Sequence, residues 1–133
     1  MVTITNLEAI QAKAALEGLA QIIYPGGTAL RIKRMYREIA AIVADVEALR
    51  VEALQRLGKH GDDGQLVTDD KGNVAFPTVE AAREFAAYVR SIHEATVEVR
   101  YMLTEAEATS RDVAPGLLIG LGGLLVEDTE KGE

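Results

Sequence analysis

The chain has no cysteine, which excludes disulfide bonds, thiolate catalysis and any zinc site built on cysteine. Histidine, the usual acid-base group near neutral pH, occurs only as His60 and His93. Neither stands in a motif with a nucleophile. The second histidine that a metalloprotease helix needs four positions after the first is replaced by Val97. We therefore expect no catalytic histidine and no metal centre.

Long apolar runs are also missing. No segment approaches the roughly 20 apolar residues that a helix needs to cross a bilayer. Residues 1–7 lack the basic start and apolar body of a signal peptide. These absences predict a soluble, cytoplasmic protein without a membrane segment.

What the sequence does contain is typical of a globular fold. Its 133 residues are 48% apolar and 26% charged, so we expect a single domain over 1–133 with its own core. The net charge of −7 is unevenly distributed. Residues 1–60 carry eight basic and six acidic side chains, whereas residues 61–133 carry six and fifteen. Because nucleic-acid binding needs a basic stripe, direct binding over a broad face is not expected.

Two helices are predicted in the first half. Thr5 and Glu8 have the spacing of a capping box for a helix over 6–24, which Pro25-Gly26-Gly27 would end. Thr28 would cap a longer helix over 28–57. An antiparallel pair would leave the far end of the longer helix to be covered by other parts of the chain or by another protein. The apolar stripes are Ala9, Ala12, Leu16, Leu19, Ala20 and Ile23 on the first helix, and Ile32, Ile39, Val46 and Ala53 at intervals of seven on the second.

The second half mixes strands and helices. Residues 65–76 read as a β-hairpin with a glycine-containing turn, and 79–94 as a third helix capped by Thr78. Residues 96–103 alternate apolar and polar side chains and could add a third strand to the hairpin. Thr104 and Glu107 form another possible capping box, over one short turn.

The last segments complete the expected fold. Pro115 can begin a short helix over 115–126, weakened by its glycines, and a frayed tail follows at 127–133. We thus predict an α+β fold that is mostly α. It would combine an antiparallel helical hairpin with one long helix, a third helix, and a small antiparallel β-hairpin or three-stranded sheet.

Charged clusters are the first candidate sites. The basic cluster Arg31, Lys33, Arg34 and Arg37 is either a solvated helix face or a surface for a partner, for the acidic half of the molecule or for a neighbouring copy. The acidic loop is formed by Asp62, Asp63, Asp69 and Asp70. It lacks the register of a calcium-binding EF-hand, so solvated turn carboxylates are the simpler interpretation.

Glycine-rich stretches are the remaining candidates. Residues 26–28 lack the lysine of a phosphate-binding loop, and 120–123 follow no predicted strand and open no predicted helix. We therefore expect neither an enzyme nor a cofactor.

Several short motifs follow one another from the end of the long helix to the C-terminal segment. They are Leu57-Gly58, Gly-Asp-Asp-Gly at 61–64, Asp-Lys-Gly-Asn-Val-Ala-Phe at 70–76, Glu-Ala-Ala-Arg-Glu-Phe at 80–85, Thr-Val-Glu-Val at 96–99, Pro-Gly-Leu-Leu at 115–118 and Leu-Leu-Val-Glu at 124–127. This order resembles a family of small tailed-phage proteins of unknown function that are encoded among late genes near tail components, and the resemblance spans roughly 28–127. It implies no catalytic residues, and it implies a phage protein that binds other proteins, located in the host cytoplasm or the virion.

Two hypotheses for function follow. The first is a non-enzymatic interaction protein for virion assembly or structure, in the tail or neck region, whose partner is a phage component, a host protein or a second copy. The second is an acidic phage inhibitor of a host protein, with the acidic loop at 62–70 mimicking nucleic-acid phosphates. The residues expected to bind the partner under the first hypothesis are Arg31, Lys33, Arg34, Tyr36, Arg37, Val43, Arg50 and Leu57.

Overall fold

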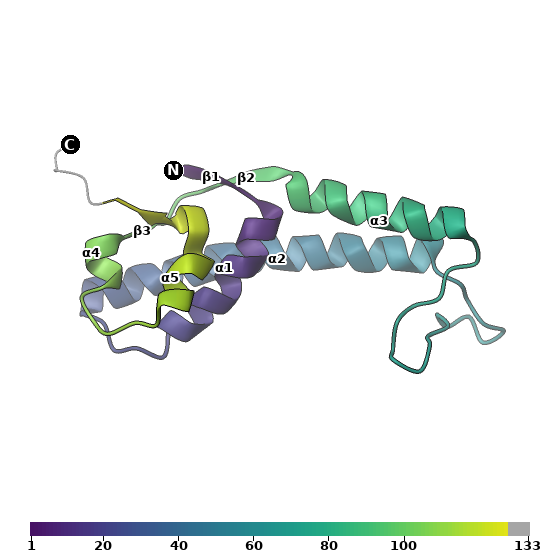
Figure 1. The fold of residues 1–133 in the computed structure, drawn as a ribbon, viewed down its shortest axis with the longest axis horizontal. Coiled ribbons are helices and arrows are strands. Elements are labelled where there is room, and N and C mark those ends of the chain that lie inside the picture. The colour runs from purple at the N-terminus through teal and green to yellow at the C-terminus, as the bar shows by residue number, and fades with distance from the viewer. Residues whose placement is uncertain (128–133) are drawn as a thin grey trace. The chain divides into compact units, whose positions relative to one another are not determined.

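The structure is a computed structural model that describes residues 1–127. Helices dominate and the strands are short (Figure 1), which confirms the predicted mostly-α, α+β class. In chain order the elements are β1 (Val2–Thr5), α1 (Asn6–Leu19), α2 (Gly26–Leu57), α3 (Val79–Glu94), β2 (Thr96–Val99), β3 (Leu103–Thr104), α4 (Glu105–Ala108), α5 (Pro115–Leu121), the 3-10 helix η1 (Gly122–Leu124) and β4 (Leu125–Val126).

The described residues fall into two compact units. The first contains residues 1–44 and the segment from 95 onward, and the second contains Asp45–Glu94. Helix α2 contributes its first part to the first unit and its last part to the second. The expectation of a single domain stays a prediction.

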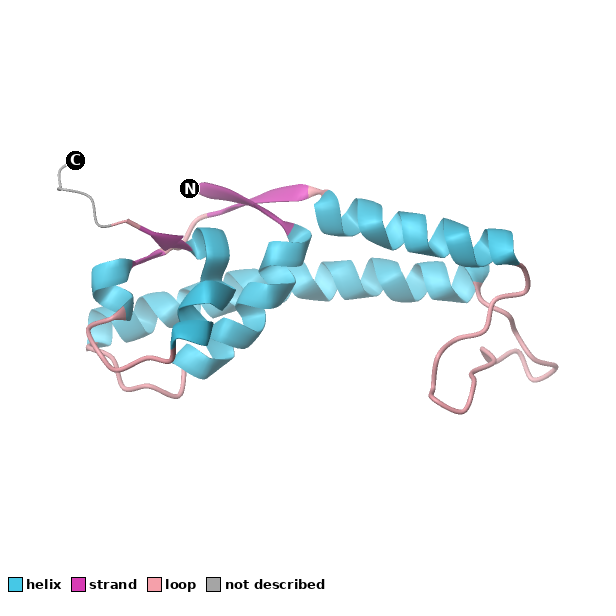
Figure 2. Cartoon of the chain, viewed as in Figure 1, coloured by secondary structure: helices cyan, strands magenta, loops and turns pink. Residues whose placement is uncertain are grey.

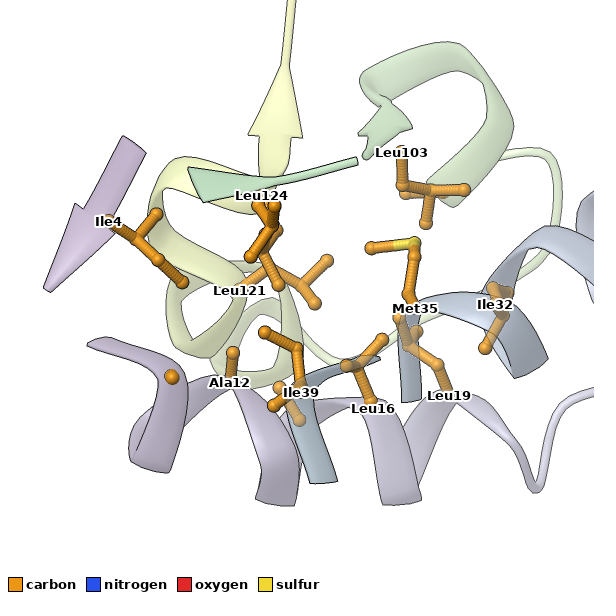
Figure 3. Close-up of a cluster of buried hydrophobic side chains, with 14 of the residues drawn as sticks. Ile4, Ala12, Leu16, Leu19, Ile32, Met35, Ile39, Leu103, Leu121 and Leu124 are labelled. Carbon is orange, nitrogen blue, oxygen red and sulfur yellow. The ribbon is translucent and has the colours of Figure 1, made fainter. Parts of the chain in front are cut away.

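The core of the first unit is built almost entirely from aliphatic side chains (Figure 3). Helix α1 contributes a stripe of alanine and leucine, the start of α2 adds Ile32, Met35 and Ile39, and α5 with η1 closes the cluster through Leu121 and Leu124. Small residues let two of these helices approach closely. A side chain on Gly120 would meet the Cβ of Ala15 at 2.9 Å. Close packing of α1 against α5 therefore depends on these small residues.

Helix α1 is shorter than predicted, ending at Leu19 and not at residue 24. The capping box of Thr5 and Glu8 is present as expected. The helical pattern ends in tighter three-residue hydrogen bonds, from the amide of Gln21 to the carbonyl of Gly18 and from the amide of Ile22 to that of Leu19. Ala20 and Ile23, both expected on the buried stripe, are exposed, and Ile23 is 88% accessible.

Helix α2 begins at Gly26, two residues before the predicted start. The amide of Ala29 donates to the carbonyl of Pro25, so Thr28 lies within the first turn and is not the cap. The predicted seven-residue repeat is confirmed, because Ile32, Ile39, Val46 and Ala53 are all buried.

The strand pairing differs from the prediction of a three-stranded sheet. Residues 2–5, for which no strand was predicted, form β1, which pairs antiparallel with β2. Thr5 lies opposite Thr96, and Val2 lies opposite Val99. The strand at 96–103 therefore joins the N-terminus and does not join the hairpin at 65–76. In the described residues the sheets are two-stranded.

The predicted strand at 96–103 is interrupted after Val99. The carboxylate of Glu38 accepts the backbone N–H groups of Arg100 and Tyr101, at 2.9 and 3.2 Å for the shorter contact of each. These two amides are therefore not available to donate hydrogen bonds to a neighbouring strand. The chain resumes as β3, which pairs in parallel with β4.

Residues 58–78 form a compact loop and not a regular hairpin (Figure 2). Isolated bridges join His60 to Leu66 and Thr68 to Val74, and the amide of Asp69 donates to the carbonyl of Asn73. The chain thus reverses where the hairpin was predicted. Two tight turns, closed by the amides of Gly64 and Gly72, leave only isolated bridges between the short apolar runs, so neither run becomes a strand.

The C-terminal prediction of one helix over 115–126 is also corrected. Helix α5 ends at Leu121 because Gly122 adopts a φ of +53°, which favours glycine. Residues 122–126 then form η1 and β4. The capping box of Thr104 and Glu107 begins α4 as predicted. Apart from Glu127, the predicted frayed tail lies outside the described residues.

Candidate interaction surfaces

The second unit is a hairpin of two antiparallel helices, the end of α2 and the whole of α3, closed by the loop at 58–78 (Figure 1). Helix α3 covers one side of the last turns of α2, whose Val46 and Ala53 are buried. The covering is stabilised by a cation–π contact of Arg56 with the ring of Tyr88, 5.8 Å from its centroid. The far end of the long helix is therefore covered in part by its own chain.

The hairpin buries little of its apolar surface. Within 45–94, all of which the structure describes, the buried hydrophobic side chains are only Val46, Ala53 and Ile92. By contrast, Leu49 is 40% exposed, Val51 41% and Val79 61%. We call these three residues the exposed apolar set of the hairpin. The half-buried apolar residues of the unit larger than alanine are Leu54, Leu57, Leu66, Val67, Val74, Phe76, Phe85, Tyr88 and Val89.

The loop is attached to the hairpin by its aromatic and aliphatic residues. The ring of Phe76 lies 5.4 Å from that of Phe85 on α3, measured between centroids. Gly58 admits the side chains of Leu66 and Val74, since a Cβ there would meet them at 2.7 and 3.0 Å. This packing positions the loop that carries the acidic residues.

The predicted basic cluster lies on the first part of α2, and its members have different surroundings. The guanidinium of Arg31 forms an ion pair of 2.6 Å with Glu107. Lys33 lines a different hollow, described below, whereas Arg34 and Arg37 line a groove together with Arg100. Sequence reasoning missed Arg100. Its only signal was a polar position in a predicted strand, which gave no indication of proximity to α2.

The groove beside α2 has two lobes. One, of about 590 Å³, is lined by Arg34, Arg37, Glu38, Arg100 and Tyr101. The other, of about 360 Å³, shares Arg34, Arg100 and Tyr101 with it. We call the two together the arginine groove. The additional residues of the second lobe are Arg31, Met102, Thr104 and Val126.

The remaining predicted partner-binding residues are divided between the two units. The hydroxyl of Tyr36 donates to Glu17 at 3.1 Å, and Val43 is half-buried in the first unit. Arg50 and Leu57 belong to the second unit, where Arg50 pairs with Glu47 at 2.6 Å. The hydrogen bond between them lowers the pKa of Glu47 and raises that of Arg50. Their charges are thus already matched.

The acidic loop is exposed at all four aspartates, but two of them also build turns. Asp63 accepts the amide of Gln65 at 3.0 Å. Asp69 accepts the amides of Asn73 and Lys71, and these backbone hydrogen bonds lower the pKa of its carboxyl. Asp62 and Asp70 have no hydrogen bond or ion pair within the described residues. In the region described, no three carboxylate or imidazole groups come together as a metal site would require.

A further hollow of about 490 Å³ lies between the end of α1 and the start of α2. Its walls are mainly apolar, including Leu19, Ile22 and Ile32, and Lys33 and Tyr36 supply the polar groups. Across residues 1–127, no helix is both long and apolar enough to cross a bilayer.

Searches against protein-family models, curated proteins and solved structures find no significant match to this chain.

Proposed function

We propose that this chain is a non-enzymatic phage protein that binds another protein through its helical hairpin and serves virion assembly or structure. The observation that carries this proposal is the incomplete burial of the hairpin. Leu49, Val51 and Val79 remain exposed in a unit that buries few of its apolar side chains. Full burial of an exposed side chain of this size is worth roughly 1.5–3 kcal/mol. Because Leu49, Val51 and Val79 are already partly covered, a partner that contacted any of them would gain about half of that per side chain, before the costs of association.

The resemblance of the motif order to small tailed-phage proteins supports the phage part of the proposal. It covers residues that build the hairpin, such as the Gly-Asp-Asp-Gly turn at 61–64 and the start of α3 at 80–85. It supports a location in the virion or the host cytoplasm and a structural component as partner. The hairpin and loop would be the part of the chain that makes the contact.

The experiment combines light scattering with affinity purification from phage-infected cells. We expect the wild-type chain to self-associate or to retain a phage structural protein identified by mass spectrometry. Leu49→Glu and Val79→Glu should abolish this, because each places a charge in an apolar contact. The matched control is Ala87→Glu, since Ala87 is exposed on α3 beside Glu84 and the added charge is the same. A strictly monomeric wild type that retains no virion component contradicts the proposal.

The alternative proposal, an acidic inhibitor of a basic host protein, is favoured by the exposure of the acidic loop. Asp62 and Asp70 are the residues to change, because Asp63 and Asp69 also hold turns. If this alternative is correct, Asp62→Lys combined with Asp70→Lys abolishes binding to the host partner. Unchanged binding by the double variant removes it.

A further inference from the structure

The arginine groove brings together cations from distant parts of the chain. Arg34 and Arg37 lie on successive turns of α2, and Arg100 follows β2 more than sixty residues later. Each of the three arginines is exposed, and all line the larger lobe. The groove is therefore a local concentration of positive charge in a chain whose net charge is −7.

The carboxylates beside the groove already have hydrogen-bond or ion-pair partners. Glu38 lines it, but its two oxygens accept the amides of Arg100 and Tyr101 at 2.9–3.2 Å. Glu107 is paired with Arg31 at 2.6 Å. Within the described residues, the guanidiniums of Arg34, Arg37 and Arg100 have no carboxylate partner. Counting Glu38, the larger lobe carries two positive charges in excess.

Guanidinium groups present several N–H donors in a fixed plane, and these match the oxygens of a phosphate or carboxylate. A single carboxylate brings one charge and two oxygens, which is less than three arginines can bind. A phosphate or diphosphate group brings two or more charges and oxygens that point in several directions. The excess charge and the number of N–H donors that three guanidiniums supply therefore favour phosphate.

We propose that the arginine groove binds a small phosphate-bearing molecule, with the phosphate held by Arg34, Arg37 and Arg100. The second lobe adds Tyr101, Met102 and Val126, which offer an apolar surface for an organic group attached to the phosphate. The ligand class is thus a small phosphate or diphosphate ester. This inference is independent of the hairpin and of its proposed partner.

The experiment is a calorimetric titration of the full chain with inorganic pyrophosphate at low ionic strength, repeated with inorganic phosphate and with a nucleoside 5′-diphosphate. Saturable binding is expected. An ester that binds more tightly than pyrophosphate identifies the second lobe as part of the site, whereas equal affinities confine the site to the phosphate lobe and overturn the ester assignment. In a parallel NMR titration, the amide signals of Arg100 and Tyr101 should shift, because Glu38 holds both at the groove.

The variants separate a defined site from general charge attraction. Arg34→Gln combined with Arg37→Gln should weaken binding by about tenfold or more, since two charge-assisted contacts are lost. The control is Arg83→Gln combined with Arg90→Gln, which removes the same charge from exposed positions of α3. Equal weakening in both double variants, or no saturable binding by the wild type, overturns the proposal. Circular dichroism melting of each variant checks that it is folded.

Discussion

The hydroxyl of Tyr24 donates a hydrogen bond of 2.6 Å to the backbone carbonyl of Ala108, which lies 84 residues further along the chain. Both residues are buried. The bond ties the segment after α1 to the end of α4 within the first unit.

We expect Tyr24→Phe to lower the free energy of unfolding by roughly 1–2 kcal/mol, since the Ala108 carbonyl would be left buried without its donor. Chemical denaturation of the variant and the wild type measures the difference. The control is Tyr36→Phe. The hydroxyl of Tyr36 donates only to an exposed carboxylate, so its removal should lower the free energy of unfolding less. Equal effects of the two substitutions would show that the buried hydrogen bond stabilises the protein no more than the exposed one.

Tyr24 should also make stability depend on alkaline pH. Burial raises the pKa of its phenol above 10.0, partly offset by Arg111. The native state then keeps a proton on Tyr24 that the unfolded chain loses. The contribution of this phenol to the free energy of unfolding is therefore fully present below about pH 10 and is lost as the pH rises through the folded pKa. The free energy of unfolding, measured by chemical denaturation between pH 8 and 11, should fall more steeply with pH for the wild type than for Tyr24→Phe. Equal slopes for the two proteins would argue against Tyr24 as the origin of this pH dependence.

We expect Glu38→Gln to destabilise the first unit by about 1 kcal/mol, because the variant loses charge-assisted hydrogen bonds to the amides of Arg100 and Tyr101. Amide exchange of these two residues should accelerate. Exchange at Val99, which pairs with Val2 in the sheet, serves as the internal control and should change less. Unchanged exchange at both amides would mean that Glu38 does not hold this segment.

Substitution by alanine should have opposite effects on stability at two glycines of α5. Gly120→Ala would place a Cβ 2.9 Å from that of Ala15. Relieving this contact requires the backbone of one helix to shift, so we expect the free energy of unfolding to fall by roughly 1–2 kcal/mol. Gly116→Ala meets nothing within 4 Å and should gain up to about 1 kcal/mol of helix propensity. Thermal unfolding of the pair measures both. A stabilising Gly120→Ala would show that α1 and α5 pack more loosely than the structure indicates.

Asp69 should titrate below its ordinary pKa of 3.8, because the backbone amides of Asn73 and Lys71 donate to its carboxylate. The folded pKa is the lower one, so the stabilisation of the turn is present above about pH 4 and is lost as the pH falls through the folded value. A carbon-detected NMR titration measures the carboxyl directly. Asp69→Ala should speed exchange of the Asn73 amide, whereas Asp62→Ala should leave it unchanged. A pKa at or above 3.8 would contradict the prediction.

The sequence by itself determined the features that depend on near neighbours. The capping boxes at Thr5 and Thr104, the bounds of α3 and the seven-residue repeat of α2 each involve residues within one or two turns, so spacing reveals them. The basic cluster on α2 and the acidic turns were visible for the same reason.

Only the tertiary structure decided which distant segments meet. The pairing of β1 with β2, the interruption after Val99 by Glu38, and the approach of Arg100 to Arg34 and Arg37 all join residues far apart in sequence. A strand pattern marks a half-buried surface but does not name its partner, because pairing is set by which faces remain to be covered once the helices have packed. The exposure of Leu49, Val51 and Val79 follows from the same packing, since helix periodicity alone does not show how much of an apolar stripe the chain covers.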